Sequence, residues 1–168
     1  MQFLNPTQCN EWCQRHGFLP PDQFKCLIKT KSLPVHEFNI PSDAGRRVTM
    51  SRALWKFVAH AEEHEQLIWM VEWGVWLANE HMPLFDRLRS AFGETRPLIE
   101  APGQVVQPNE EEEGLSFLVI AAVFLWDCWV YSTSGAIAMV SHNEFGMVYE
   151  PREERQADIR QVLANIAG

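Results

Sequence analysis

The chain has 168 residues, a formal net charge of −8 and a pI near 5.2, with 46% hydrophobic and 21% charged residues. This composition is that of an ordinary globular protein and excludes the disordered and collagen-like classes. The length fits one domain, residues 1–168, with a substantial core. The acidic balance would repel phosphates, so we expect no nucleic-acid or anionic-membrane partner, whereas a basic protein partner fits.

The N-terminal segment, residues 1–12, lacks the basic and apolar regions of a signal peptide, which predicts a cytoplasmic protein. The apolar run at residues 117–126 is shorter than the roughly 20 residues that a membrane span needs, so it predicts a core element. A reducing compartment would keep all four cysteines as free thiols: Cys9, Cys13, Cys26 and Cys128.

The N-terminal region begins with a predicted helix over residues 6–17. Asn5 or Thr7 can cap this helix, and Pro6 suits its first turn. Helical spacing places four residues on one face, which predicts a buried stripe: Cys9, Trp12, Cys13 and His16.

The next segment is predicted to be extended. One face of residues 24–28 would carry Phe24, Cys26 and Ile28, alternating with Lys25, Leu27 and Lys29, which favours a strand. A second extended piece covers residues 36–40. Residues 42–45 read as a turn, after which Thr49 or Ser51 opens a helix. The apolar face of that helix comprises Leu54, Phe57, Val58 and Ala61.

Residues 66–76 admit two interpretations. Apart from Glu72, residues 67–73 are apolar on both alternating registers, as in a strand covered on both faces, and Gly74 also favours a strand. A continuous helix over residues 51–79 is the alternative, because short apolar runs do not separate the two states.

The following region contains a helix, a long connection and a second ambiguous segment. Pro83 starts an amphipathic helix that Gly93 ends, and residues 94–108 form a long connection. Asn109 can cap a helix over residues 110–124, although the β-branched residues there leave a strand as the alternative.

The C-terminal region predicts a meander of three strands, at residues 126–131, 136–141 and 145–149, followed by a terminal helix that begins at Pro151. Helices that flank a mainly antiparallel sheet give an α+β fold, with this meander at its centre.

The densest group of chemically competent side chains lies where two of these strands turn. A histidine beside a carboxylate there can act as a general base, and acidic side chains from neighbouring strands can complete a polar pocket between tryptophans. The candidate binding cluster comprises Glu72, Trp73, Trp76, Asp127, Trp129, Ser141, His142, Asn143 and Glu144. The simpler interpretation is a hairpin turn in which Asn143 adopts a left-handed backbone and Ser141 bonds its own loop.

Two patterns have metal-ligand character, but we predict no metal site and no cofactor. Residues 60–64, His-Ala-Glu-Glu-His, resemble the His-x-x-Glu-His zinc signature of the inverzincin metallopeptidases over five residues only. Cys9, Cys13 and His16, with Cys26, offer zinc-compatible side chains, yet the first three coincide with the predicted core stripe.

Several blocks together resemble a group of uncharacterised bacterial proteins: Glu72-Trp73-Gly74-Val75-Trp76, the helix of residues 84–93, Glu100-Ala101-Pro102-Gly103, Trp126-Asp127 and Ser141-His142-Asn143-Glu144. The resemblance covers roughly residues 66–149 and implies no activity. In that group Pro-Gly is often followed by His, and the turn tends to read Ser-His-Asp-Glu. This chain has Gln104 and Asn143 instead, so a catalytic or metal cluster at those positions would lack two members, which favours binding.

Two functional hypotheses follow. The first is a small, acidic, bacterial protein-binding module of the immunity or inhibitor kind, without enzymatic activity. The second is a small hydrolase or ligand-binding enzyme that uses His142 and Glu144 with Glu72 or Asp127. The sequence indicates neither the partner, the ligand nor the oligomeric state.

Overall fold

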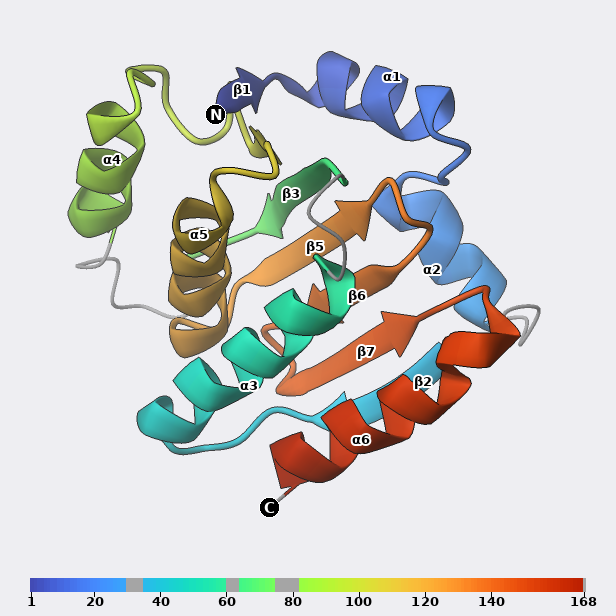
Figure 1. Ribbon diagram of the computed structural model, residues 1–168. Coiled ribbons are helices and arrows are strands. Elements are labelled where there is room, and N and C mark those ends of the chain that lie inside the picture. Colours follow the sequence, from blue (N-terminus) through green and yellow to red (C-terminus); the bar gives the residue numbers. More distant parts are fainter. Residues whose placement is uncertain (30–34, 60–63, 75–81, 168) are drawn as a thin grey trace.

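The protein folds around one seven-stranded sheet in which every pair of neighbouring strands is antiparallel. Figure 1 shows how the helices surround this sheet. The computed structural model describes residues 1–29, 35–59, 64–74 and 82–167. The strand order is β1-β4-β3-β5-β6-β7-β2. The predicted single-domain α+β fold is confirmed, including the meander of β5, β6 and β7 and the terminal helix.

The strands are β1 (Gln2–Leu4), β2 (Val35–Asn39), β3 (Gln66–Glu72), β4 (Gly103–Val106), β5 (Asp127–Ser132), β6 (Ile137–Val140) and β7 (Phe145–Tyr149). The helices are α1 (Pro6–Arg15), α2 (Pro21–Lys29), α3 (Ala44–Val58), α4 (Met82–Ala91), α5 (Glu111–Val123) and α6 (Gln156–Ala167), and a 3₁₀ turn at Glu153–Arg155 precedes α6.

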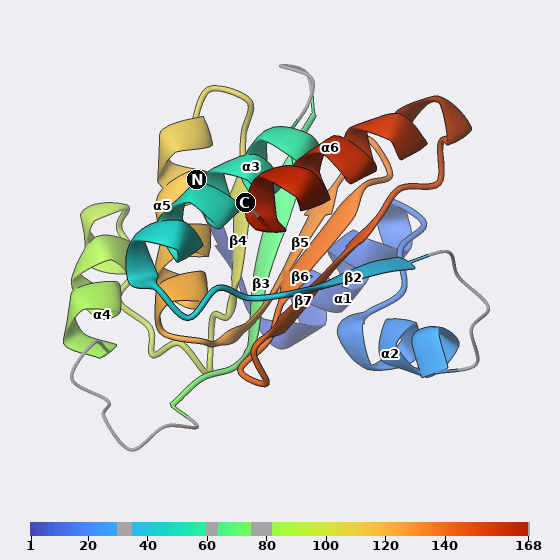
Figure 2. The same ribbon diagram turned by 90° about the horizontal axis from the view of Figure 1, so that it is seen from below.

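Helices cover both faces of the sheet, and Figure 2 shows the resulting three layers. On one face α3, α5 and α6 pack over the sheet, with α4 beside α5. On the other face lie α1 and α2. Each interface forms its own apolar cluster, so the central strands are buried on both sides.

The central strand β3 settles the first ambiguity of the sequence in favour of a strand. Ile68 and Met70 join the cluster beneath α3 and α5, whereas Leu67 and Trp69 join the cluster beneath α1 and α2. A strand buried on both faces carries apolar residues in both registers, which explains why its sequence shows no alternation. The second ambiguous segment, residues 110–124, is helical as α5.

Helix α1 confirms the prediction for residues 6–17. The Asn5 side chain accepts a hydrogen bond from the Gln8 backbone, and the Gln8 side chain accepts one from the Asn5 backbone, which completes a capping box. Cys9, Trp12 and Cys13 are buried as predicted. His16 is exposed instead, with its ring 4.4 Å from that of Trp12.

The predicted strand at residues 24–28 is wrong, because this segment lies in the helix α2. Pro21 occupies the first turn of that helix, where a backbone N–H would have no partner within the helix. The negative charge of Asp22 in the same turn stabilises the positive end of the helix dipole. Phe24 is buried against Trp129, with ring centroids 5.5 Å apart. Positions 24 and 28 share a helix face as well as a strand face, so the alternation was ambiguous.

The long connection predicted at residues 94–108 contains the buried strand β4, which pairs with both β1 and β3. A Cβ atom at Gly103 would lie 2.3 Å from the Cys9 Sγ, so glycine is what allows α1 to approach this strand. The short strand β1 was not predicted either.

Helix α3 begins earlier than predicted, at Ala44 rather than near Thr49 or Ser51. The Asp43 side chain accepts a hydrogen bond from the Arg46 backbone at 2.8 Å and caps the helix there. The predicted turn at residues 42–45 is therefore partly the first turn of α3. Helix α5 follows Glu110, not Asn109, and no side chain caps it.

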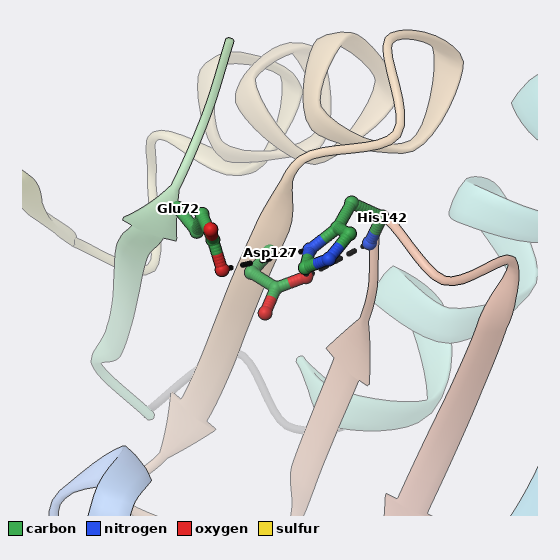
Figure 3. Close-up of side chains that lie close together, drawn as sticks. All are labelled: Glu72, Asp127 and His142. Carbon is green, nitrogen blue, oxygen red and sulfur yellow. Dashed lines mark hydrogen bonds and ion pairs between the residues drawn. The ribbon is translucent and has the colours of Figure 1, made fainter. Parts of the chain in front are cut away.

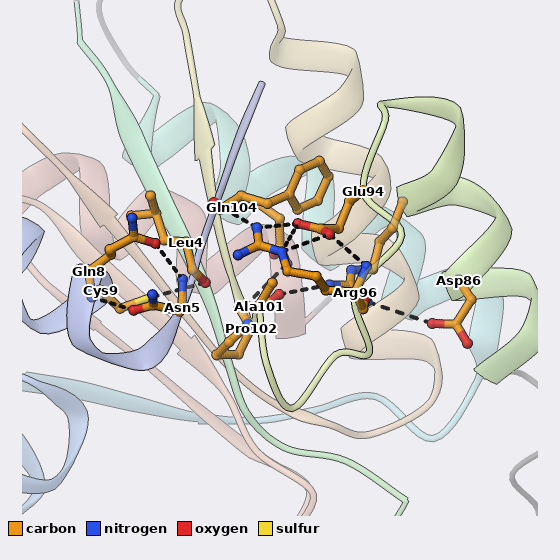
Figure 4. A network of polar contacts seen from close by, with 12 residues as sticks. Leu4, Asn5, Gln8, Cys9, Asp86, Glu94, Arg96, Ala101, Pro102 and Gln104 are labelled. Atoms are coloured by element: carbon orange, nitrogen blue, oxygen red, sulfur yellow. Dashed lines mark hydrogen bonds and ion pairs between the residues drawn. The ribbon is translucent and has the colours of Figure 1, made fainter.

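A buried arginine shapes the connection between α4 and β4, and Figure 4 shows Glu94, Arg96 and Ala101 of this connection. Arg89 is almost fully buried and donates hydrogen bonds to the backbone oxygens of Arg96, at 3.0 Å, and Ala101, at 2.9 Å. Arg96 in turn pairs with Glu94 through Nε and Oε1 at 3.0 Å. These contacts hold the chain in place before it enters β4.

Among the described residues, no helix is long and apolar enough to cross a bilayer.

Substitution of Trp126 tests how much the aromatic side chains of the core contribute to the stability of the fold. It is fully buried, and its ring lies 4.9 Å from that of Phe85 in an edge-to-face arrangement. We expect Trp126→Ala to lower the free energy of unfolding by about 3 to 5 kcal/mol, because the truncation leaves a large cavity. Chemical denaturation monitored by circular dichroism measures this change.

Leu84→Ala is the matched control, because Leu84 is 56% exposed and its truncation should change the free energy of unfolding by less than about 0.5 kcal/mol. Equal stabilities for the two variants would contradict the assignment of Trp126 to the core.

Candidate functional site

Four of the predicted site residues come together at one end of the sheet, and Figure 3 shows three of them, Glu72, Asp127 and His142. Glu72 ends β3, Asp127 begins β5, and Ser141 and His142 directly follow β6. Because these strands are antiparallel neighbours, the end of β3 lies opposite the start of β5, which in turn adjoins the end of β6. A register shift between Met70 and Glu72 brings Glu72 opposite Asp127.

Asp127 is the centre of this site. Its Oδ1 accepts hydrogen bonds from the Ser141 hydroxyl at 2.9 Å and from the His142 backbone N–H at 2.8 Å. The His142 Nδ1 also lies 2.8 Å from Oδ1, and a proton on Nδ1 makes this a third hydrogen bond. On the other side, Lys25 Nζ of α2 lies 3.5 Å from Oδ2.

These donors keep Asp127 ionised despite its burial. Burial by itself raises the pKa of the Asp127 carboxyl, but the bonds from His142 and Ser141 and the charge of His142 outweigh burial and lower the pKa below its ordinary value. Asp127 therefore provides a fixed negative charge that orients the imidazole of His142.

Glu72 completes a triangle of metal-compatible groups. Its Oε2 lies 3.6 Å from the His142 Nδ1, and its side chain is 53% exposed. One ligand atom from each of Glu72, Asp127 and His142 lies within 4.8 Å of the others. We call these three residues the Glu72–Asp127–His142 cluster. Among the described residues, this is the only set of three or more such groups close enough to hold one metal ion.

The turn after β6 is partly as predicted. Ser141 Oγ accepts a hydrogen bond from the Asn143 backbone at 3.3 Å, so Ser141 does bond its own loop. The left-handed residue is Glu144, with φ of 61°, and not Asn143. Both Asn143 and Glu144 are exposed, and neither belongs to the cluster.

A groove of about 310 Å³ adjoins the cluster on the α1 and α2 side of the sheet. Its floor is formed by the end of β3, including Trp69 and Val71, and by Trp73, which directly follows Glu72. Asp22, one helical turn before Lys25, stands at its rim. The remaining lining residues are mostly apolar: Pro6, Asn10, Pro20, Pro21, Met70, Ile99 and Pro102.

The other candidate tryptophans are placed differently. Trp129 is fully buried between Phe24 and Tyr131, so it supports the sheet beneath α2 rather than lining the groove. Trp76 lies outside the described residues. Trp73 is thus the one candidate tryptophan of the described chain that lines the groove.

The structure bears on the cysteine pattern, but it describes only one residue of the histidine motif. Cys9 and Cys13 are free thiols buried against the sheet, and burial raises the pKa of each to about 12, which disfavours the thiolate form that binds metal. The motif at residues 60–64 lies outside the described residues except for His64, whose Nδ1 is 3.4 Å from the Thr133 hydroxyl.

Sequence reasoning missed Lys25 and most of the groove. The sequence favours a strand for the segment that holds Lys25, whereas the structure places Lys25 on the helix α2, with its ammonium near Asp127. The sequence places Ile99 in a long connection and gives no sign of the groove, because residues far apart in sequence meet there. A proline pair at the start of a helix was the available signal for α2.

No family model, curated protein or solved structure matches the chain. The resemblance at residues 66–149 thus remains a prediction. The two positions at which this chain departs from it lie outside the cluster: Gln104 is buried in β4 and donates to the Pro102 oxygen, and Asn143 is exposed.

The low pKa of Asp127 predicts a loss of stability in acid. Because this pKa is lower in the folded than in the unfolded chain, the contribution of Asp127 is complete above its ordinary pKa of 3.8 and is lost as the pH falls through the folded value. We expect Asp127→Asn to cost about 1 to 3 kcal/mol near neutral pH and progressively less below pH 3.8. Urea melts from pH 7 to pH 2 measure the difference.

Asp22→Asn is the control, since Asp22 is an exposed aspartate on the same helix as Lys25. A constant difference between wild type and Asp127→Asn over the whole pH range would show that the charge of Asp127 is not what stabilises the fold.

Proposed function

We propose that the protein is a protein-binding module and that the groove beside the Glu72–Asp127–His142 cluster receives a partner segment with a basic residue next to an apolar one. The observation that carries this proposal is an apolar groove with an acidic rim. Trp69, Trp73 and Ile99 supply apolar surface, and Ile99 is 69% exposed although it is a large apolar residue. Exposed apolar patches of this kind commonly serve interaction.

The negative charge around the groove favours a partner with basic residues. Asp22 is exposed and lines the groove, and Glu72 is exposed between the lining residues Val71 and Trp73. Glu100 and Glu11 are exposed and directly follow the lining residues Ile99 and Asn10 in the sequence. The overall charge of −8 has the same sign. An arginine or lysine approaching Trp73 would meet both the face of an aromatic ring and nearby carboxylates, which together favour a cation.

The setting proposed for this activity is the cytoplasm of a bacterial cell. All four cysteines are free, and Cys26 is exposed, as suits a reducing compartment.

A peptide-binding assay tests the proposal. We expect fluorescence anisotropy to detect binding of a short peptide that contains Arg-Leu pairs, with affinity falling as salt rises, and to detect no binding of the same peptide with Glu in place of Arg. Trp73→Ala should weaken binding at least about tenfold, because aromatic anchors dominate such interfaces. Glu72→Gln should weaken it less and reduce the salt dependence.

Leu84→Ala supplies the control, as Leu84 is an exposed apolar residue outside the groove. Equal binding of the Arg and Glu peptides, or full binding by Trp73→Ala, would rule out this groove as the docking site.

A second function, hydrolysis, is favoured by one specific contact. With its Nδ1 proton donated to Asp127, His142 presents Nε2 as the acceptor, the tautomer that a general base needs. The Ser141 hydroxyl donates to Asp127, so the base would activate water rather than this serine. Glu144, which the sequence suggested as a second catalytic group, is exposed and outside the cluster.

Hydrolysis of p-nitrophenyl esters separates the two functions. If the chain is a hydrolase, His142→Gln should reduce the rate at least about 100-fold, as loss of a general base does, and Glu144→Gln should leave it unchanged. A rate that does not exceed that of free imidazole, or that survives His142→Gln, would exclude the hydrolytic function.

A further inference from the structure

We propose that the Glu72–Asp127–His142 cluster is a binding site for a zinc-like divalent transition metal, with one ligand from each side chain and solvent in the remaining position. This inference goes beyond the proposed protein-binding function and does not depend on it. It rests on the donor set, the spacing of the donor atoms and the arrangement of the surrounding charges.

The spacing of the donors suits a single small ion. Ligands about 2.0 to 2.2 Å from a tetrahedral zinc lie about 3.4 Å from one another. In the cluster His142 Nδ1 is 2.8 Å from Asp127 Oδ1 and 3.6 Å from Glu72 Oε2. These two distances bracket the tetrahedral value, so an ion can enter with small side-chain adjustments after it displaces the Nδ1 proton.

The donors come from a rigid framework. Asp127 and Glu72 are paired residues of adjacent strands, and the backbone N–H of His142 is itself bonded to Asp127. The Ser141 hydroxyl donates to the same carboxylate and can orient it as an outer partner of a metal ligand. Figure 3 shows all three side chains directed toward one another.

The choice of ion follows from ligand chemistry. One imidazole nitrogen with two carboxylate oxygens is a mixed set that suits Zn²⁺, Co²⁺ or Mn²⁺, whereas Mg²⁺ and Ca²⁺ prefer oxygen ligands alone. Three protein ligands with an open fourth position, partly exposed through Glu72, correspond to a reactive or exchangeable zinc site rather than a closed structural one.

Lys25 is the cation that competes with the metal. Its ammonium lies 3.5 Å from Asp127 Oδ2, and its side chain is 37% exposed, so it can turn toward solvent when an ion binds. Removal of this charge should therefore strengthen metal binding. If the three side chains only stabilised the fold and bound no metal, removal of the Lys25 charge would not strengthen metal binding. Substitution of Lys25 therefore distinguishes the two roles.

Titration calorimetry of the full chain with ZnCl₂ tests the site. We expect one equivalent to bind to wild type, Glu72→Gln and His142→Ala each to weaken binding at least about tenfold, and Lys25→Gln to strengthen it about two- to fivefold. Co²⁺ gives a second readout, because coordination of His142 in a tetrahedral site produces intense visible absorption that His142→Ala should abolish. Glu144→Gln, at an exposed carboxylate two residues from His142, should bind Zn²⁺ as wild type does.

Circular dichroism melts establish that each variant is folded. Glu72→Gln is the most informative of them, because the exposed Glu72 side chain contributes little to stability. The site is overturned if wild type binds no Zn²⁺ at micromolar concentration, or if Lys25→Gln lowers the affinity. It is also overturned if His64→Ala removes binding while Glu72→Gln keeps it, since the ion would then belong to the segment around His64.

Discussion

The burial of both faces of β3 and β5 is the constraint on which the rest of this structure depends. Two strands without a solvent-facing side need helices above and below, and the chain supplies α3, α5 and α6 on one face and α1 and α2 on the other. Polar side chains are consequently confined to the strand ends. Asp127, at the start of β5, is buried, and its charge is tolerated because four groups of three residues, Ser141, His142 and Lys25, contact it.

The apolar pattern of residues 67–73 favours the buried strand at this centre, because burial on both faces places apolar residues in both registers, but it leaves a continuous helix as the alternative, which the structure excludes. It also predicted that Glu72, Asp127 and the turn after β6 would meet, since ends of neighbouring antiparallel strands share an edge. The periphery was predicted less well. Phe24, Cys26 and Ile28 fit a strand and, in part, a helix, and only the packing of Phe24 on Trp129 decides between them. Strand β4 has four residues between loops, too short to show a period.

The details of the site depended on tertiary contacts that a single sequence does not show. Lys25 reaches Asp127 only because α2 is a helix that lies across the sheet. The sequence places Glu144 in the candidate cluster because a carboxylate near His142 can support a general base. Its left-handed backbone instead forms the turn, and its oxygen accepts a bond from Ile40 at 2.8 Å. Glu144 is close to His142 in sequence but lies outside the cluster, whereas Lys25 is distant in sequence and contacts Asp127.

The pairing of β2 with β7 has a consequence for how the chain assembles. Val35 lies opposite Tyr149, so this edge of the sheet joins segments from near the two ends of the sequence. The three consecutive strands β5, β6 and β7 need only short loops to meet, whereas β2 requires a much larger loop to close. During folding the meander is therefore suited to form first and to serve as the template on which β2 docks. An open β7 edge would then be the surface most exposed to pairing with other chains before folding is complete.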